Sequence, residues 1–477
     1  MPRFSTAFGL TNAQAELDFV DIDLATDTPL YLDPYAIQIR ADEFSESCTD
    51  HIRSFFNALL DALREDNDVR ATSLLSNLRE PNETFLGQSV GRPRGRAVGT
   101  HKGAELARAI RESRAFETGL LSDLSEAALF IYGVGSDTIS DLTTNILRNL
   151  LAEYTKEQCE IYGIETRPVR NIGPIWNITR RDWEACALDL PIYHGRPILL
   201  VPKSLVRFRL CLDTQEFYNH HMIEFLRQEY ENSNSSLVNI LKDGTRRVYK
   251  NAVKERHPMI KDDLASFVRD HPEVLERYKE LKGAEGALEI DELERFFDER
   301  VFANALIERL QAIPGGNDSA SEYHSVMIGI CTFLFHPSLI IPVKEQEIHE
   351  GRKRIDIKFT NAARRGFFAT VLQSPQMRSI NVPIECKNYT RRIANPEMDQ
   401  LQGRFGHTRG FFGILLCRDM DNKDRIRAGC RDTALDGRGY MLALDDEDII
   451  SMLGFVRDGL RGNIDRYLQM RLDEISG

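Results

Sequence analysis

The 477-residue sequence lacks a long apolar run, and this absence argues against two classes of protein. No window approaches the roughly 18 consecutive apolar residues of a membrane span. The N-terminus also lacks the basic start and apolar stretch of a secretory signal. We therefore expect a cytoplasmic chain with no membrane partner.

Paired cysteines are also missing. The eight cysteines are scattered without any CxxC pair or regular histidine partner, at positions 48, 159, 186, 211, 331, 386, 417 and 430. This pattern argues against a disulfide framework and a structural zinc site, and fits a reducing compartment. The sequence has no internal repeat, low-complexity tract or coiled-coil heptad, so no such pattern specifies an oligomer.

Positive charge is scarce overall but concentrated in one segment. The net charge of −12 speaks against a general nucleic-acid binder, which needs clustered Lys and Arg. Residues 351–410, however, carry twelve Lys or Arg against four acids, a net +8, so the rest of the chain carries −20. An acidic remainder discourages indiscriminate binding to polyanions, which makes this basic segment a specific signal.

The length predicts about three units, at roughly 150 residues per domain. We expect a mixed α/β domain of unknown function over 1–175, a strand hairpin with a helical connector over 176–312, and a third domain over 313–477. The last boundary rests on the turn-forming and capping residues of 313–321. In the first two units, two short strands joined by a turn are expected within 17–35, helices at 41–66, 100–115, 122–130 and 138–163, a hairpin within 176–210 and helices over 214–310.

The third unit shows a recurring order of elements. A helix over 321–335 precedes strand-like segments at 339–348, 352–360, 367–373 and 380–389, and a helix at 395–405 precedes a strand at 411–417. A helix at 421–434 and a strand at 439–445 follow. The order reads α-β-β-β-α-β with one extra or merged strand, which predicts a mixed sheet flanked by helices.

Two strand-like segments carry the polar residues that could do chemistry. In a strand, residues two apart share a face, so Glu385 and Lys387 point together, away from Cys386. Asp356 is the acid on an otherwise apolar strand that includes Ile357. If the two strands are neighbours, two carboxylates and a lysine meet, a group that suits Mg²⁺ and an attacking water.

The series RIDI, IECKN and a helix containing QLQGRF, after a helix bearing a Glu, resembles the PD-(D/E)xK restriction-endonuclease-like nuclease superfamily over about a quarter of the chain. The resemblance implies a restriction-endonuclease-like αβββαβ core and catalytic roles for Asp356, Glu385 and Lys387, with Glu322 on the first helix and Gln400 or, as we prefer, Gln402 on the later one. It also implies Mg²⁺, or Mn²⁺, with Asp356, Glu385 and Cys386 as candidate ligands. Ile355 stands where the family often has Pro, and 28 residues separate Asp356 from Glu385, which implies a long loop.

Each of these residues has a simpler interpretation. An ExK triplet is common on solvated strands, Glu322 can be a first-turn acid that stabilises the helix dipole, and Gln400 and Gln402 can be surface residues. The order of the elements and the local +8 charge favour the nuclease. The basic residues expected to hold phosphates of double-stranded DNA are Arg352, Lys353, Arg354, Arg391, Arg392, Arg404 and Arg409.

Together these features predict a Mg²⁺-dependent endonuclease in restriction or antiphage defence, with an N-terminal part that recognises a trigger or accessory protein. A homo-oligomer is expected if both DNA strands are cut. The alternatives are an RNA nuclease and a catalytically inactive nucleic-acid-binding module. The Gly/Arg-rich segment 86–100 lacks a P-loop ending and is interpreted as a surface loop, and Gly133, Gly135 and Asp141 belong to a weak strand-to-helix motif that capping by Ser136 or Asp137 would also explain.

Overall fold

The computed structural model describes residues 2–87, 100–233, 235–294, 297–344, 356–388, 395–407, 409–420 and 422–476. The chain is mixed α/β, with much more helix than strand. Its buried apolar residues form two core clusters, one built largely from the first 290 residues and one from the residues after them. None of the helices in these described ranges is both long enough and apolar enough to cross a membrane.

The N-terminal region is built around one long buried helix. Its helices are α1 (Phe4–Ala7), α2 (Pro34–Gln38), α3 (Glu43–Arg64), α4 (Asp68–Ser76), α5 (Thr100–Arg111), α6 (Arg114–Glu117), α7 (Ala127–Phe130) and α8 (Ser136–Tyr162). Helix α8 ends at Gly163, whose φ of 68° is the left-handed conformation that favours glycine. These helices confirm those expected from the apolar spacing.

The pair of strands expected within 17–35 is wrong. Only β1 (Tyr31–Leu32) forms there, and it pairs with β8 (Val206–Arg207) from far along the chain. In the segment before β1, the side chain of Gln14 forms hydrogen bonds with the backbone: it donates to Phe19 O and accepts from Asp21 N. A local hairpin is therefore replaced by side-chain bonds and a distant partner strand.

Short antiparallel pairs follow α8. They are β2 (Arg167–Val169) with β5 (Leu188–Leu190), β3 (Ile175–Asn177) with β4 (Asp182–Glu184), and β6 (Ile192–Tyr193) with β7 (Arg196–Pro197). The last pair is the hairpin expected within 176–210. The apolar run after it, 198–201, is buried without becoming a strand.

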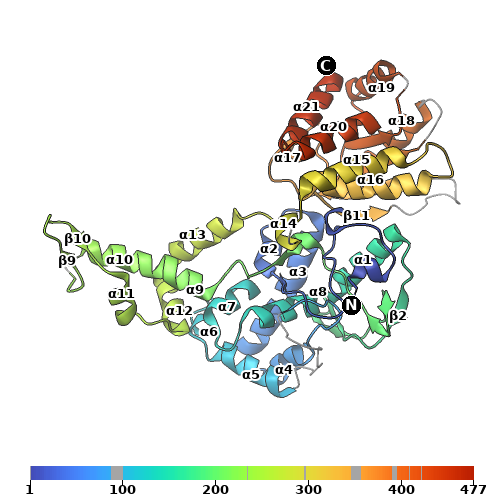
Figure 1. Cartoon of the computed structure of the whole chain (residues 1–477). Coiled ribbons are helices and arrows are strands. Elements are labelled where there is room, and N and C mark those ends of the chain that lie inside the picture. Colours follow the sequence, from blue (N-terminus) through green and yellow to red (C-terminus); the bar gives the residue numbers. More distant parts are fainter. Residues whose placement is uncertain are drawn as a thin grey trace.

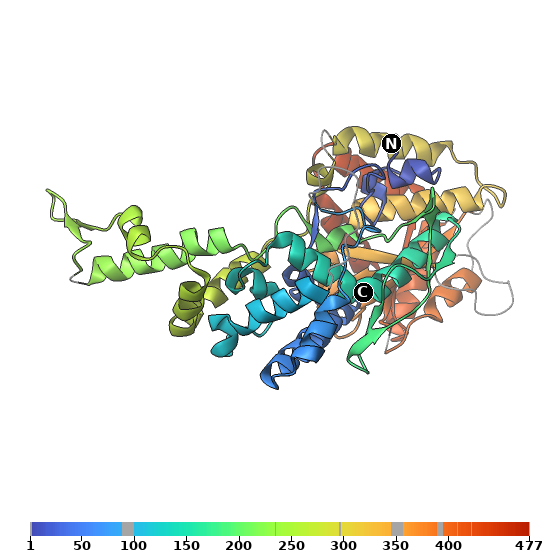
Figure 2. The same cartoon turned by 90° about the horizontal axis from the view of Figure 1, so that it is seen from below.

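A helical arm then projects from the body of the molecule (Figure 1), and the view from below shows the same projection (Figure 2). It contains α9 (Thr214–Phe217), a π-helical turn (Tyr218–Met222), α10 (Ile223–Asn232), a hairpin of β9 (Asn239–Ile240) and β10 (Arg246–Arg247), α11 (Lys250–Arg256), α12 (Lys261–Asp270) and α13 (Pro272–Gly283). After the arm, the chain continues through α14 (Ile290–Leu293) and α15 (Glu299–Ala312). Helix α15 packs against α20 (Asp446–Arg457) of the C-terminal region.

The C-terminal region contains a five-stranded mixed sheet in the order β11 (Leu339–Lys344), β12 (Asp356–Asn361), β13 (Asn381–Lys387), β14 (Phe412–Cys417), β15 (Tyr440–Asp445). The first three strands are antiparallel neighbours, and β13, β14 and β15 are parallel. The other helices are α16 (Ala320–Phe335), α17 (Phe367–Gln373), α18 (Asn395–Gln402), α19 (Lys423–Leu435) and α21 (Asn463–Ser476).

The strand expected at 367–373 is wrong, because this segment is helix α17. Its buried residues include Phe367, Phe368 and Val371, a spacing that places one apolar face against the core. The helix starts after Gly366 at φ 78°, and the Asp465 carboxylate accepts a hydrogen bond from Phe367 N at its first turn. A seven-residue apolar run does not distinguish a buried strand from a short helix by periodicity alone.

Candidate functional site

The centre of the sheet brings together the two strands that carry the candidate acids. In the antiparallel ladder between β12 and β13, Asp356 is the direct register partner of Glu385. Opposed positions in such a ladder lie on the same face of a sheet. The side chain of Asp356 lies outside the described atoms, so the finding concerns backbone register: position 356 lies opposite position 385.

Glu385 and Lys387 form an ion pair on β13, between Glu385 Oε1 and Lys387 Nζ. Their side chains are 0% and 3% exposed, so the pair is buried. The Nζ of Lys387 also donates a 3.4 Å hydrogen bond to Gln400 Oε1 on α18. The Nε of Arg404, just after α18, lies 3.9 Å from Glu385 Oε2. One carboxylate is thus held between two cations, and one amide contacts the lysine.

The surrounding strand explains why a charged pair can lie here. All seven residues of β13 are buried, and Val382, Ile384 and Cys386 alternate with the polar positions and belong to the C-terminal core. Burial of a carboxylate or an ammonium alone costs several kcal/mol, so each ion needs a partner of opposite charge. The alternation fixes one apolar and one ionic face on the same strand.

Cys386 does not join the ionic residues through its thiol. Burial raises the pKa of the thiol well above its usual value, and its surroundings include Cys331 and Cys417 of the apolar core. Its backbone carbonyl interacts with the imidazole Nε2 of His324 on α16 at 2.9 Å. The side chain of Cys386, a candidate metal ligand, therefore points into the apolar core. His324, which we did not single out from the sequence, connects α16 to β13. A lone histidine in the apolar run of α16 was the signal for it.

Two further candidates lie apart from the ion pair. Glu322 is exposed on the first turn of α16, where an acid stabilises the positive end of a helix. The side chain of Gln402 has no hydrogen bond to Lys387 among the described residues; that bond is made by Gln400. The sequence left two glutamines as candidates, with Gln402 preferred. The structure brings Gln400 into contact with Lys387 instead.

Of the seven predicted phosphate-binding residues, the structure describes two, Arg404 and Arg409. Arg404 is only 12% exposed and lies beside Glu385, while Arg409 is exposed. Arg404 therefore lies within ion-pair distance of the Glu385 carboxylate, and its phosphate-binding role stays a prediction. Those that lie outside the described residues are Arg352, Lys353, Arg354, Arg391 and Arg392.

A divalent cation at the sheet would need oxygen ligands from neighbouring side chains. Among the described side chains, which do not include that of Asp356, no three His, Cys, Asp or Glu groups gather in a metal-binding arrangement. Mg²⁺ usually keeps several waters and takes only one or two protein carboxylates together with substrate phosphates. Positions 356 and 385, opposed in register, fit that small ligand set.

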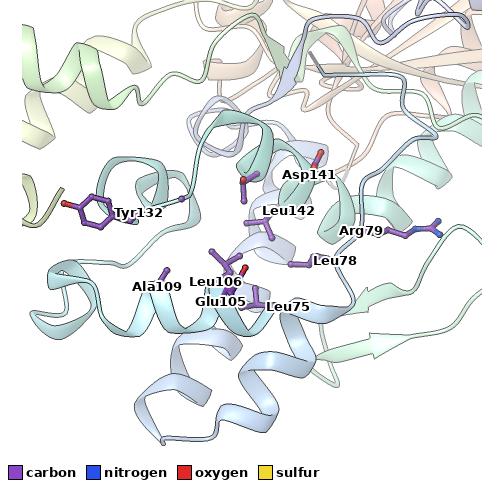
Figure 3. A pocket seen from close by; sticks show the side chains of 11 residues that line it. Leu75, Leu78, Arg79, Glu105, Leu106, Ala109, Tyr132, Asp141 and Leu142 are labelled. Carbon is purple, nitrogen blue, oxygen red and sulfur yellow. The ribbon is translucent and has the colours of Figure 1, made fainter. Parts of the chain in front are cut away.

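A separate pocket lies in the N-terminal region, with a volume of about 270 Å³ (Figure 3). Leucines from α4, α5 and α8 form its apolar lining, with Glu105, Asp141, Arg79 and Tyr132 as polar lining residues. The glycine motif before α8 contributes Gly133. Gly135 is the N-cap of α8 and no side chain caps the helix there, so the alternative explanation of the motif, capping by Ser136 or Asp137, is wrong. The lining therefore combines an apolar surface with a few polar groups.

Residues 9–213 match a family model described as a domain of unknown function, DUF8370. The match includes α8 and the N-terminal pocket and ends before the arm and the five-stranded sheet. No curated protein and no solved structure matches the chain.

Proposed function

We propose that the C-terminal region is a divalent-metal-dependent endonuclease of the PD-(D/E)xK type that hydrolyses phosphodiester bonds of DNA. The observation that carries the proposal is the register of Asp356 with Glu385, which lies two strand positions from its buried ion-pair partner Lys387 and on the same face. Two carboxylates and an ammonium on neighbouring strands are the chemical groups that such a reaction requires.

The order and directions of the elements support the proposal. Helix α16 precedes three antiparallel neighbours, β11, β12 and β13, and α18 leads into β14, which is parallel to β13. This agrees with the αβββαβ order expected for the superfamily, with α17 inserted between β12 and β13. The inserted helix also accounts for part of the long interval between Asp356 and Glu385.

The chain's own residues would divide the work as follows. Asp356 and Glu385 would hold Mg²⁺ or Mn²⁺, which supplies Lewis-acid chemistry and a more acidic water when bound. Lys387 would stabilise the negative charge that develops on the phosphoryl oxygens and orient the attacking water. Gln400, within hydrogen-bond distance of Lys387, would fix the direction of the ammonium.

The decisive experiment compares plasmid nicking by the natural chain and by Asp356→Asn, Glu385→Gln and Lys387→Ala, with Mg²⁺ or Mn²⁺ present. The natural chain should nick the plasmid and each variant should lose at least about a hundredfold in rate, since each removes a group used in the transition state. Arg378→Ala, which removes an exposed cation of the same basic segment, is the control and should nick normally.

Loss of one partner from a buried ion pair can unfold the domain, at a cost of about 3–5 kcal/mol. Thermal unfolding of each variant therefore accompanies the assay, and Mn²⁺ binding by calorimetry gives a second readout. A folded Glu385→Gln chain that binds Mn²⁺ as tightly as the natural chain, or equal nicking by the natural chain and Lys387→Ala, would overturn the proposal.

Two alternatives make different predictions in the same experiments. A fold retained only for binding would hold DNA without metal and would keep doing so in Asp356→Asn. An RNA nuclease would cut labelled RNA and leave DNA intact when both are offered in parallel with the same metal. By analogy with effectors of this plan, we place the activity in restriction or antiphage defence, with a trigger or accessory protein read by the N-terminal region.

A further inference from the structure

The tip of the arm is a solvent-exposed β-hairpin. Strand β9 pairs with β10 through Ile240 with Arg246 and Asn239 with Arg247, and all four residues are exposed. The turn is built by Gly244 at φ 82° and by the Asp243 carboxylate, which accepts a 3.0 Å hydrogen bond from Thr245 N. The hairpin stands at the far end of the arm in both views (Figures 1 and 2).

The tip is basic in an acidic chain. Residues 239–256 carry six Lys or Arg against two acids, a net +4, whereas the whole chain carries −12. Some of these cations have structural partners: Arg246 donates to the backbone carbonyls of Glu231 and Ser233, and Lys250 pairs with Glu224. Within the described residues, neither Lys242 nor Arg247 is paired with a carboxylate.

The position of the Arg247 guanidinium is restrained by an aromatic ring. Its Cζ lies 5.3 Å from the ring centroid of Tyr249, which is itself 49% exposed. Such stacking reduces the entropy that an arginine loses when it binds an anion and leaves its N–H groups free to donate. Arg246, fixed to the end of α10, holds the hairpin on the arm. The tip therefore presents oriented cations on a supported ribbon.

We infer that this hairpin binds the phosphate backbone of duplex DNA, and thereby contacts DNA away from the five-stranded sheet. The major groove of DNA admits a two-stranded β-ribbon, and Lys and Arg that neutralise phosphates supply most of the non-specific affinity. The large exposed apolar side chains of the described tip are Ile240 and Tyr249, too few for the apolar centre of a protein interface. The choice of DNA as partner rests on the proposed function.

The test is binding of the full chain to a fluorescent DNA duplex by anisotropy, in EDTA and over a range of salt concentrations. Lys242→Gln/Arg247→Gln removes two tip cations that have no carboxylate partner among the described residues. Its Kd should rise on the order of tenfold at physiological salt, and the slope of log K against log salt should become shallower by about 2, or about 1 per phosphate contact. Lys242→Arg/Arg247→Lys should restore binding.

The matched control is Arg170→Gln/Arg277→Gln, which removes two exposed charges from other parts of the chain and should leave affinity within about twofold. The inference would be overturned if both double variants lost affinity equally, or if the hairpin variant bound DNA as the natural chain does. It would also be overturned if the natural chain bound polyglutamate, a polyanion control, but no duplex DNA. Because the assay is metal-free, its outcome is separate from cleavage: a chain that binds through the hairpin but never nicks contradicts the nuclease alone. A chain that nicks but binds equally without the hairpin charges contradicts the hairpin alone.

Discussion

The Nζ of Lys387 on β13 donates a 3.4 Å hydrogen bond to the Oε1 of Gln400 on α18. If Lys387 acts on the scissile phosphate, its direction depends on this amide. We expect Gln400→Ala to lower the rate of plasmid nicking roughly tenfold, as loss of a residue that orients a ligand usually does. The effect should appear in the maximal rate rather than in DNA affinity.

Gln402 provides the internal control for that experiment. It lies on the same helix and was preferred from the sequence, but it makes no hydrogen bond to Lys387 in the described part of the chain. Gln402→Ala should nick DNA at nearly the natural rate. A larger loss in Gln402→Ala than in Gln400→Ala would contradict the assignment of the positioning role.

Arg404 should oppose metal binding. Its Nε lies 3.9 Å from Glu385 Oε2, and a cation near a metal-binding carboxylate repels a divalent ion. Even in a water-like dielectric, two unit charges about 4 Å apart interact by about 1 kcal/mol. We expect Arg404→Gln to tighten Mn²⁺ binding by roughly fivefold or more in calorimetry. Exposed Arg409→Gln should leave metal affinity unchanged; weaker metal binding in Arg404→Gln would contradict the argument.

The sequence predicted the secondary structure correctly where a helical pattern of apolar residues was long or a strand alternation was strict. The long helices α3 and α8 follow directly from apolar spacing, and the strand alternation around Glu385 and Lys387 predicts the face that they share. The pairing of β12 with β13 needs more than a pattern, because register depends on which strands become neighbours. That register was a condition of the nuclease hypothesis.

Short apolar segments and distant partners were beyond the sequence. Helix α17 has a seven-residue apolar pattern that reads equally as a strand, and β1 finds its partner β8 across most of the N-terminal region. The arm's hairpin has two-residue strands with every residue exposed, so no apolar alternation marks it. Side-chain bonds such as His324 to the carbonyl of Cys386 depend on packing between elements and leave no periodic signal.

Arg364 joins the loop after β12 to the N-terminal body and the arm. Its Nη1 donates to Gly283 O at the end of α13 and its Nη2 to Ile39 O after α2, each at 2.6 Å. Removing these bonds with Arg364→Ala should lower stability by about 1 kcal/mol, after allowance for the exposure of the side chain. Hydrogen exchange should rise around residues 279–283, near the carbonyl that loses its donor.

The neighbouring Arg365 allows a matched comparison. It is exposed and has no side-chain hydrogen bond or ion pair with the described residues. Arg365→Ala removes the same charge from the same loop and should leave exchange around 279–283 unchanged. Equal exchange in the two variants would show that the contact of Arg364 does not stabilise the end of the arm.

His336 should make the stability of the folded chain fall in acid. It is buried after α16, and desolvation, together with the positive charges of Lys203, Arg40 and Arg461, lowers its pKa well below 6.5. The unfolded chain takes up a proton near pH 6.5 and the folded chain does not, so the unfolded state binds more protons and stability decreases as pH falls. The loss approaches about 1.4 kcal/mol per pH unit below that value.

Chemical denaturation at pH 7.5, about 6.5 and about 5.5 should therefore show a steeper loss of unfolding free energy in the natural chain than in His336→Gln, which has no proton to take up. The comparison is between slopes, so a constant loss of stability caused by the substitution itself does not affect it. His220→Gln, at an exposed position on the arm, should keep the natural slope. If His336→Gln also keeps the natural slope, the acid sensitivity arises from other groups, because a histidine that is buried and neutral in the folded chain cannot be removed without changing proton uptake on unfolding.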